Sequence, residues 1–99
     1  MPFLVEYVRS GVSSSDYDRL KESLGWAKDP PIGALFHVVA FEGDTVHISE
    51  VWESKAEFDD FTAKRVTPAL DALGLPSVSP TVRETYDVAT FAAVARYQV

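Results

Sequence analysis

The 99-residue chain lacks cysteine and has no long apolar run. Without cysteine there can be no disulfide framework, no thiolate metal site and no cysteine nucleophile. No stretch approaches the roughly 20 consecutive apolar residues that a membrane span needs, and Glu6 interrupts the apolar start before a secretory-type segment can form. We therefore expect a cytoplasmic protein without a membrane partner.

Positive charge is also scarce. Nine Lys and Arg residues against fifteen Asp and Glu residues give a net charge of −6, which repels phosphate backbones and provides no counterion release on binding nucleic acid. We therefore expect no nucleic-acid partner. A phosphate-cradling glycine loop, a nucleophile elbow and a dinucleotide fingerprint are absent too, and no cofactor is expected.

What remains is the composition of an ordinary globular chain, with 46% apolar and 12% aromatic residues. A chain of this length supports one core but not two. We expect a single domain over residues 1–99. The secondary structure of the C-terminal tail, residues 89–99, is left unassigned. Its alanines favour a helix, while its Phe, Val and Tyr side chains could extend a strand.

Hydrophobic periodicity predicts the order strand, helix, strand, strand, helix, strand. Serines 13–15 offer helix N-caps, with Ser15 and Asp18 at capping-box spacing, and Pro68 predicts either a kink or a fresh helix start with Thr67 as cap. The expected strands are residues 3–9, 34–42, 45–53 and 81–88, and the expected helices lie between residues 13 and 24 and between 54 and 73.

This order is the split βαβ arrangement, an α+β fold. We expect a ferredoxin-like βαββαβ domain whose four-stranded antiparallel sheet has both helices on one face. The other face also carries large apolar side chains, and an exposed apolar patch of that size normally marks an interface. We therefore expect a homodimer that forms through this sheet face.

A two-residue turn at Gly43-Asp44 sets the register of the central hairpin. Counting outward places His37 opposite Glu50, and Leu35 opposite Trp52. His37 and Glu50 are then a polar pair on an apolar face, with Cβ atoms about 5 Å apart. The carboxylate would fix the imidazole tautomer, as a general base requires. The pattern equally fits a buried pair that only stiffens the sheet.

The second histidine, His47, falls on the opposite face of the predicted sheet. The two histidines therefore cannot join one metal site, and His37 with Glu50 alone provides fewer ligands than a typical zinc site. No metal is expected.

A group of aromatic side chains predicts a pocket for a flat apolar ligand, although each one alone is more commonly part of a core. The group is Tyr7, Tyr17, Trp26, Phe41, Trp52, Phe58 and Phe61. Arg65, at helical spacing from Phe61, could polarise an oxygen in that pocket. The candidate catalytic residues are therefore His37 and Glu50, and the candidate substrate-binding residues are Tyr7, Tyr17, Phe41, Trp52, Phe61 and Arg65.

Several segments between residues 1 and 88 resemble a known family. They are Gly33–Val39, Glu50–Ser54, Phe58–Phe61 and Pro68–Leu70. These segments are similar to small actinobacterial-type proteins of the dimeric α/β-barrel superfamily, in the antibiotic-biosynthesis-monooxygenase-like group. The resemblance implies two ferredoxin-like protomers packed sheet against sheet, with a pocket between the sheet and the helices of each.

The superfamily includes cofactor-free oxygenases of aromatic polyketides, polyketide cyclases, lactone isomerases and haem-degrading enzymes. Related sequences carry a histidine near the end of the last strand, where this chain has the segment Tyr86–Ala89. The helix-borne iron-binding histidine of the haem-degrading members is also missing from both predicted helices. The resemblance therefore indicates the fold better than the reaction.

We expect an enzyme that abstracts a proton from a hydrophobic aromatic or polyketide-like small molecule without a cofactor. His37 would act as the base, Glu50 would orient it, and Tyr7, Tyr17 or Arg65 would hold the resulting oxyanion. A monooxygenase, a cyclase or an isomerase step could follow. The alternative is a non-catalytic dimer that binds a small ligand or interacts with another protein.

Overall fold

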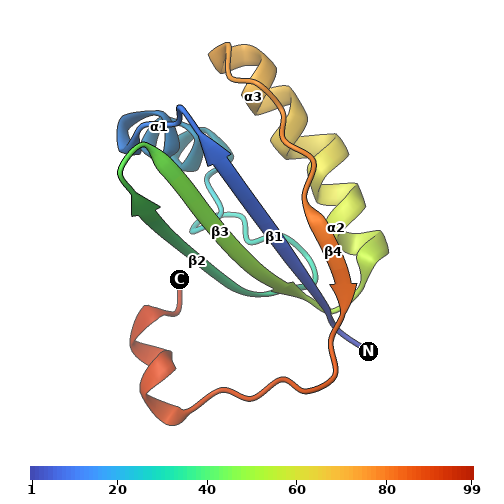
Figure 1. Ribbon diagram of the computed structural model, residues 1–99. Helices are drawn as coiled ribbons and strands as arrows, with labels where there is room; N and C mark the ends of the chain where they lie inside the picture. Colours follow the sequence, from blue (N-terminus) through green and yellow to red (C-terminus); the bar gives the residue numbers. More distant parts are fainter.

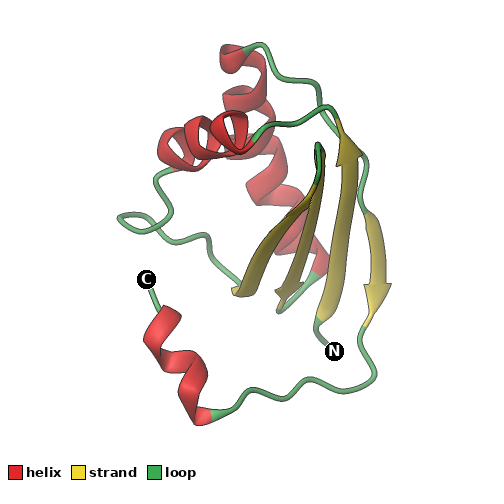
Figure 2. Ribbon diagram, turned by 60° about the vertical axis from the view of Figure 1, so that its left-hand side comes forward, coloured by secondary structure: helices red, strands yellow, loops and turns green.

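The computed structural model describes residues 1–99. Its elements are β1 (Phe3–Ser10), α1 (Ser14–Leu24), β2 (Ala34–Glu42), β3 (Thr45–Trp52), α2 (Lys55–Phe61), the π-helical turn η1 (Thr62–Val66), α3 (Thr67–Leu73), β4 (Thr81–Glu84) and the 3-10 helix η2 (Ala92–Tyr97). The antiparallel sheet has the order β2-β3-β1-β4, and helices α1 to α3 cover one of its faces (Figure 1, Figure 2). The predicted α+β ferredoxin-like fold is confirmed.

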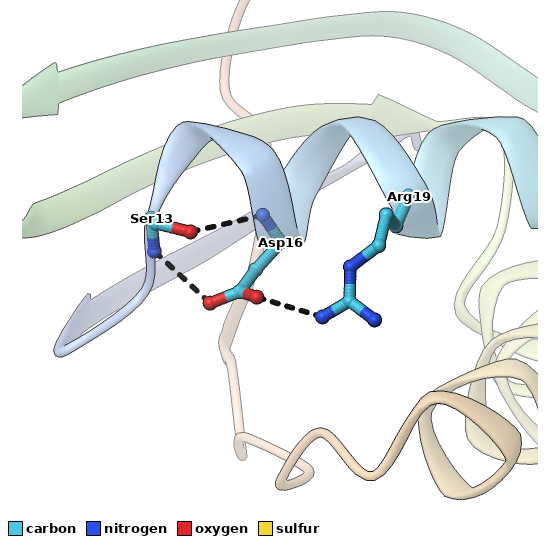
Figure 3. Close-up of polar contacts among 3 residues, drawn as sticks. All are labelled: Ser13, Asp16 and Arg19. Atoms are coloured by element: carbon cyan, nitrogen blue, oxygen red, sulfur yellow. Dashed lines mark hydrogen bonds and ion pairs between the residues drawn. The ribbon is translucent and has the colours of Figure 1, made fainter.

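Helix α1 begins with a reciprocal cap at Ser13. The Ser13 hydroxyl accepts the Asp16 N–H at 3.0 Å, and the Asp16 carboxylate accepts the Ser13 N–H at 3.2 Å (Figure 3). Arg19 donates to the same carboxylate at 2.8 Å. The Arg19 hydrogen bond, followed by those from Ser13, holds the pKa of Asp16 below its usual value. The pair that the sequence favoured, Ser15 with Asp18, lies inside the helix instead, because Ser13 is the residue that still has extended backbone angles.

The second helical segment passes Pro68 through a π-helical turn. The Thr67 N–H bonds to the Thr62 carbonyl, five residues back, so η1 holds one extra residue directly before the proline. A proline ring clashes with the carbonyl four residues back in a regular α-helix, and the wider turn relieves that clash. Pro68 therefore lies in the first turn of a new α-helical segment, as predicted, but Thr67 is the first residue of α3 and not its cap.

The central hairpin turns at Gly43, whose φ is +59°. His37 pairs with Glu50, as predicted. The predicted pairing of Leu35 with Trp52 is wrong, because a β-bulge places Ala34 opposite Trp52. Leu35 is 47% exposed as a result.

The core lies between the sheet and helices α1 and α2. Val5, Leu24, Trp52, Phe58 and Phe61 form its buried cluster. None of the helices has both the length and the apolar character that crossing a membrane requires.

The sheet face away from the helices carries apolar side chains in contact with solvent. Val8, Phe36 and Val38 on this face are 62%, 41% and 47% exposed. We call the outward side chains of β1, β2 and β3 the open sheet face.

Strand β4 is shorter than predicted. It ends at Glu84 rather than at residue 88, because the pairs of β1 with β4 begin at Phe3, and the Thr85 N–H makes a final bond to the Pro2 carbonyl at 2.9 Å. Residues 85–99 then lead away from the sheet, and η2 stands apart from the other elements (Figure 1). The tail that the sequence left open between helix and strand is therefore helical over Ala92–Tyr97.

Candidate active site

Four side chains form one chain of hydrogen bonds on the helix-covered face of the sheet. The Trp52 Nε1–H donates to Glu50 Oε1 at 3.1 Å, and Glu50 Oε2 lies 2.7 Å from His37 Nδ1. His37 Nε2 lies 2.9 Å from the hydroxyl oxygen of Tyr17, on α1. The side chains of His37 and Glu50 are 27% and 14% exposed. We call this chain the Tyr17–His37–Glu50 relay.

The partners of the imidazole fix which nitrogen carries the proton. A carboxylate only accepts, so Nδ1 carries the hydrogen and Nε2 keeps a lone pair. Burial raises the pKa of Tyr17 to about 12, and the charges of Glu50 and Asp18 add to the effect. The phenol therefore stays protonated at neutral pH and donates to Nε2. Without substrate, the basic nitrogen of His37, Nε2, therefore accepts a hydrogen bond from Tyr17.

Two aromatic neighbours fix the geometry of this base. The Tyr17 and His37 ring planes differ by 11°, but their centroids are 6.2 Å apart, so the rings meet through their edges at the hydrogen bond. The Trp26 indole packs against the imidazole at a centroid distance of 4.5 Å and an angle of 61°. The imidazole is thus restrained by a strand, a hydrogen bond at each nitrogen and an indole.

The relay borders a cavity of about 170 Å³ between the sheet and the helices. Its walls are mostly apolar and include Leu20, Ile48, Phe58, Val66 and Leu70. A dry cavity of roughly 150 Å³ is large enough for benzene, so a cavity of about 170 Å³ has room for an aromatic ring. A mostly apolar cavity with a few convergent polar groups is typical of a small-molecule site.

The structure divides the sequence-predicted site residues into two sets. His37, Glu50, Tyr7, Tyr17 and Phe61 all line the cavity. Phe41, Trp52 and Arg65 do not.

The residues outside the cavity have other contacts. Trp52 is 2% exposed and packs in the core, where its role is to donate to Glu50. Phe41 meets the edge of Tyr17, with centroids 6.5 Å apart. Arg65 donates to the Leu24 carbonyl at 2.6 Å, at the end of α1, and stacks over the Phe61 ring. Because its guanidinium is held there, Arg65 is not placed to polarise a substrate oxygen.

Sequence reasoning missed several lining residues. Trp26 was named among the aromatic side chains but was not among the candidate substrate-binding residues. Residues 75–78 lie in a loop, where the sequence has no hydrophobic periodicity that would point to the cavity. Thr62 also lines the cavity, and its hydroxyl is buried with no hydrogen-bond partner. Its position four residues after Phe58 on a predicted helix was the signal that could have found it.

Tyr7 projects from β1 into the same cavity. Burial raises the pKa of the Tyr7 phenol well above its ordinary value; the Glu50 charge adds to the rise, and the neighbouring Thr62 hydroxyl opposes it. Tyr7 therefore enters any reaction at neutral pH as a neutral hydrogen-bond donor.

His47 lies on the opposite face of the sheet, with Nε2 3.6 Å from Glu42 Oε1. No three His, Asp or Glu side chains are grouped so that they could hold a metal ion. The two histidines thus have separate surroundings, and only His37 adjoins the cavity.

The sequence matches no protein-family model and no curated protein. Solved structures do match the fold. A Deinococcus radiodurans protein provisionally assigned as an antibiotic biosynthesis monooxygenase is 21% identical, with 92% of this chain and 98% of that chain covered and a TM-score of 0.61. A Chloroflexus aurantiacus protein with the same provisional assignment is 19% identical, with 93% and 98% covered and a TM-score of 0.60.

SnoaB from Streptomyces nogalater, described as a cofactor-independent oxygenase, is 13% identical, with 88% of this chain and 94% of that chain covered and a TM-score of 0.64. The resemblance seen in the sequence is therefore confirmed at the level of the fold: the structural neighbours include antibiotic-biosynthesis-monooxygenase-like proteins.

Proposed function

We propose that this protein is a cofactor-independent enzyme of the monooxygenase or cyclase type, which removes a proton from a hydrophobic aromatic or polyketide-like substrate. The observation that carries the proposal is the Tyr17–His37–Glu50 relay at the wall of an apolar cavity. A histidine and a glutamate that only stabilised the sheet would need no opening toward a cavity, whereas both line this one. The similarity of fold to SnoaB supports the same class of chemistry.

The relay suggests how the proton moves. The substrate's acidic hydrogen, on a phenol or on a carbon conjugated to a carbonyl, faces the Tyr17 oxygen. That proton passes to Tyr17 while the Tyr17 proton passes to His37 Nε2. The imidazolium that results is stabilised by Glu50, 2.7 Å from Nδ1. Tyr17 then carries the substrate's proton, and where that proton came from a phenol it donates a hydrogen bond to the new oxyanion.

The product of this step is an electron-rich enolate or phenolate in a largely apolar cavity. With dioxygen, an anthrone methylene becomes a quinone carbonyl: the carbon takes one oxygen atom, and the other leaves as water. The substrate itself supplies the electrons, so the reaction balances without a further reductant. Attack on a carbonyl of the same molecule would instead give a cyclase.

We also propose that the protein acts as a homodimer through the open sheet face. Val8, Phe36 and Val38 are partly exposed together on this face, and a contiguous apolar patch on a protein surface commonly marks an interface. Val38→Lys would bury a charge in that interface. Sedimentation should show a dimer for the wild type and a monomer for this variant, while a wild-type monomer at micromolar concentration would contradict the proposal.

Oxygen uptake with 1,8-dihydroxyanthrone as substrate tests the catalytic proposal. His37→Gln removes the base, so turnover should fall by roughly 100-fold or more. His47→Gln is the control for loss of a histidine, because His47 lies away from the cavity, on the open sheet face, and 45% of its side chain is exposed. Sedimentation should first show that this variant keeps the oligomeric state of the wild type. Equal turnover by His37→Gln and wild type would overturn the general-base role. Tight binding of the anthrone without turnover would support a non-catalytic ligand-binding protein instead.

A further inference from the structure

A second polar group lies in the cavity, apart from the relay. His37 is on β2 and Tyr7 is on β1, and β3 runs between them. Two strand spacings amount to roughly 10 Å. The cavity residue between them, Ile48, is the direct partner of Tyr7 in the sheet. The phenols of Tyr17 and Tyr7 therefore lie toward opposite sides of the cavity, with Glu50 and Ile48 of β3 between them.

Thr62 stands beside Tyr7 and lacks a partner of its own. Its hydroxyl is buried and near enough to the Tyr7 phenol to oppose the rise of the Tyr7 pKa, yet no hydrogen bond of good geometry satisfies it, although a threonine in a helix commonly bonds to the carbonyl four residues back. It is also the first residue of the π-helical turn η1, and single π-helical turns occur frequently at functional sites. A buried hydroxyl without a partner destabilises a folded protein, so one that persists requires an explanation.

We propose that Tyr7 and Thr62 form a second oxygen-binding site, and that the substrate therefore carries two oxygen functions on opposite edges of a fused aromatic ring system. This inference rests on the proposed function, because it places the first oxygen at the Tyr17–His37–Glu50 relay. Tyr7 donates a hydrogen bond to the second oxygen, and the Thr62 hydroxyl gains the partner that it lacks in the free protein. A substrate with oxygen on one edge would leave one of the two sites unsatisfied.

Phenol probes of matched shape test the second site. The pair is 2-naphthol and 2,6-dihydroxynaphthalene, which differ by one hydroxyl on the far edge, and 1,8-dihydroxynaphthalene carries both hydroxyls on one edge. For the wild type, titration calorimetry should show that the far-edge hydroxyl tightens binding about tenfold, the usual effect of one good hydrogen bond. The same-edge isomer should show no such gain.

Two variants locate the gain. Thr62→Val preserves the shape and removes the hydroxyl, and Tyr7→Phe removes the donor; each should reduce the far-edge gain to about twofold or less while 2-naphthol binds as before. Thr62→Val should also raise the thermal midpoint by a few degrees, because it removes an unsatisfied buried hydroxyl. Thr45→Val, at the turn end of β3, is the control and should keep the tenfold gain.

The outcomes separate this inference from the proposed function. If the tenfold gain survives in both Thr62→Val and Tyr7→Phe, the second site is wrong, while binding that still depends on His37 leaves the proposed function standing. If none of the probes binds the wild-type protein, the cavity does not take aromatic oxygen compounds, and both proposals fail together.

Discussion

Replacing Glu50 by Gln should destabilise the protein, because Glu50 accepts from two donors that a glutamine cannot both satisfy. Oε2 accepts from His37 at 2.7 Å, and Oε1 accepts from Trp52 at 3.1 Å. The Gln side chain has one acceptor oxygen and one amide that only donates. Either His37 or Trp52 therefore faces another donor in the variant.

The magnitude follows from the burial of this carboxylate. Glu50 is 14% exposed, so water cannot fully replace the lost partner. Losing a hydrogen bond to a charged group costs about 1.5–3 kcal/mol. Removing a charge from a partly buried site returns part of that cost. We expect a net loss of about 1–2 kcal/mol in the free energy of unfolding, or roughly 5–15 °C in the thermal midpoint of a chain of this size.

Urea denaturation followed by circular dichroism measures this difference. Glu53→Gln is the control, because Glu53 is exposed and its side chain makes no hydrogen bond in the structure, and the free energy of unfolding should change by less than about 0.5 kcal/mol. A Glu50→Gln variant as stable as the wild type, or more so, would refute the hydrogen-bond chain from Trp52 to His37.

Three further predictions concern other parts of the molecule. Folding raises the pKa of Tyr17 from 10.0 to about 12, so its contribution to stability is present below pH 10 and is lost between pH 10 and 12; Tyr17→Phe should lose less stability across that range, and an unchanged urea-midpoint profile would contradict the assigned burial. Ser13→Ala should cost about 1 kcal/mol of unfolding free energy through loss of the α1 cap, whereas Ser15→Ala should cost less. The reverse order in urea denaturation would show that Ser13 is not the cap. Gly33 has φ +88°, and an added Cβ would lie 2.6 Å from a carboxylate carbon of α2; Gly33→Ala should therefore lower the thermal midpoint more than Gly11→Ala, which has open space around it.

The sequence was sufficient to place His37 opposite Glu50, because a two-residue turn fixes the register of the residues near it. The turn at Gly43 is two residues long, so His37 had to face Glu50. Three residues beyond His37, at Ala34, the count failed at a bulge, since alternation does not record where one extra residue is inserted. The same reasoning found the α1 helix and included Ser13 among its possible caps, but it assigned the capping-box spacing to Ser15 and Asp18 instead of Ser13 and Asp16.

Other features depend on contacts that periodicity does not contain. Arg65 has the spacing of a cavity residue, yet the carbonyl at the end of α1 and the Phe61 ring hold it elsewhere. Thr62 has helical spacing from Phe58, but the π-helical turn that it begins and its buried, unsatisfied hydroxyl are seen only in the structure. The hydrogen bond from Tyr17 to His37 joins a helix to a strand 20 residues later in the sequence. Local sequence patterns do not predict contacts over that separation.

Hydrogen–deuterium exchange at the methylene carbon of 1,8-dihydroxyanthrone tests the proton abstraction most directly. Proton NMR in D₂O without oxygen isolates this step from oxygenation or cyclisation. The wild type should accelerate the exchange over buffer. His37→Gln and Glu50→Gln should lose most of that acceleration, about 100-fold for the base itself, and His47→Gln should retain it. Exchange at the buffer rate with wild-type protein, or equal acceleration by His37→Gln, would contradict the account.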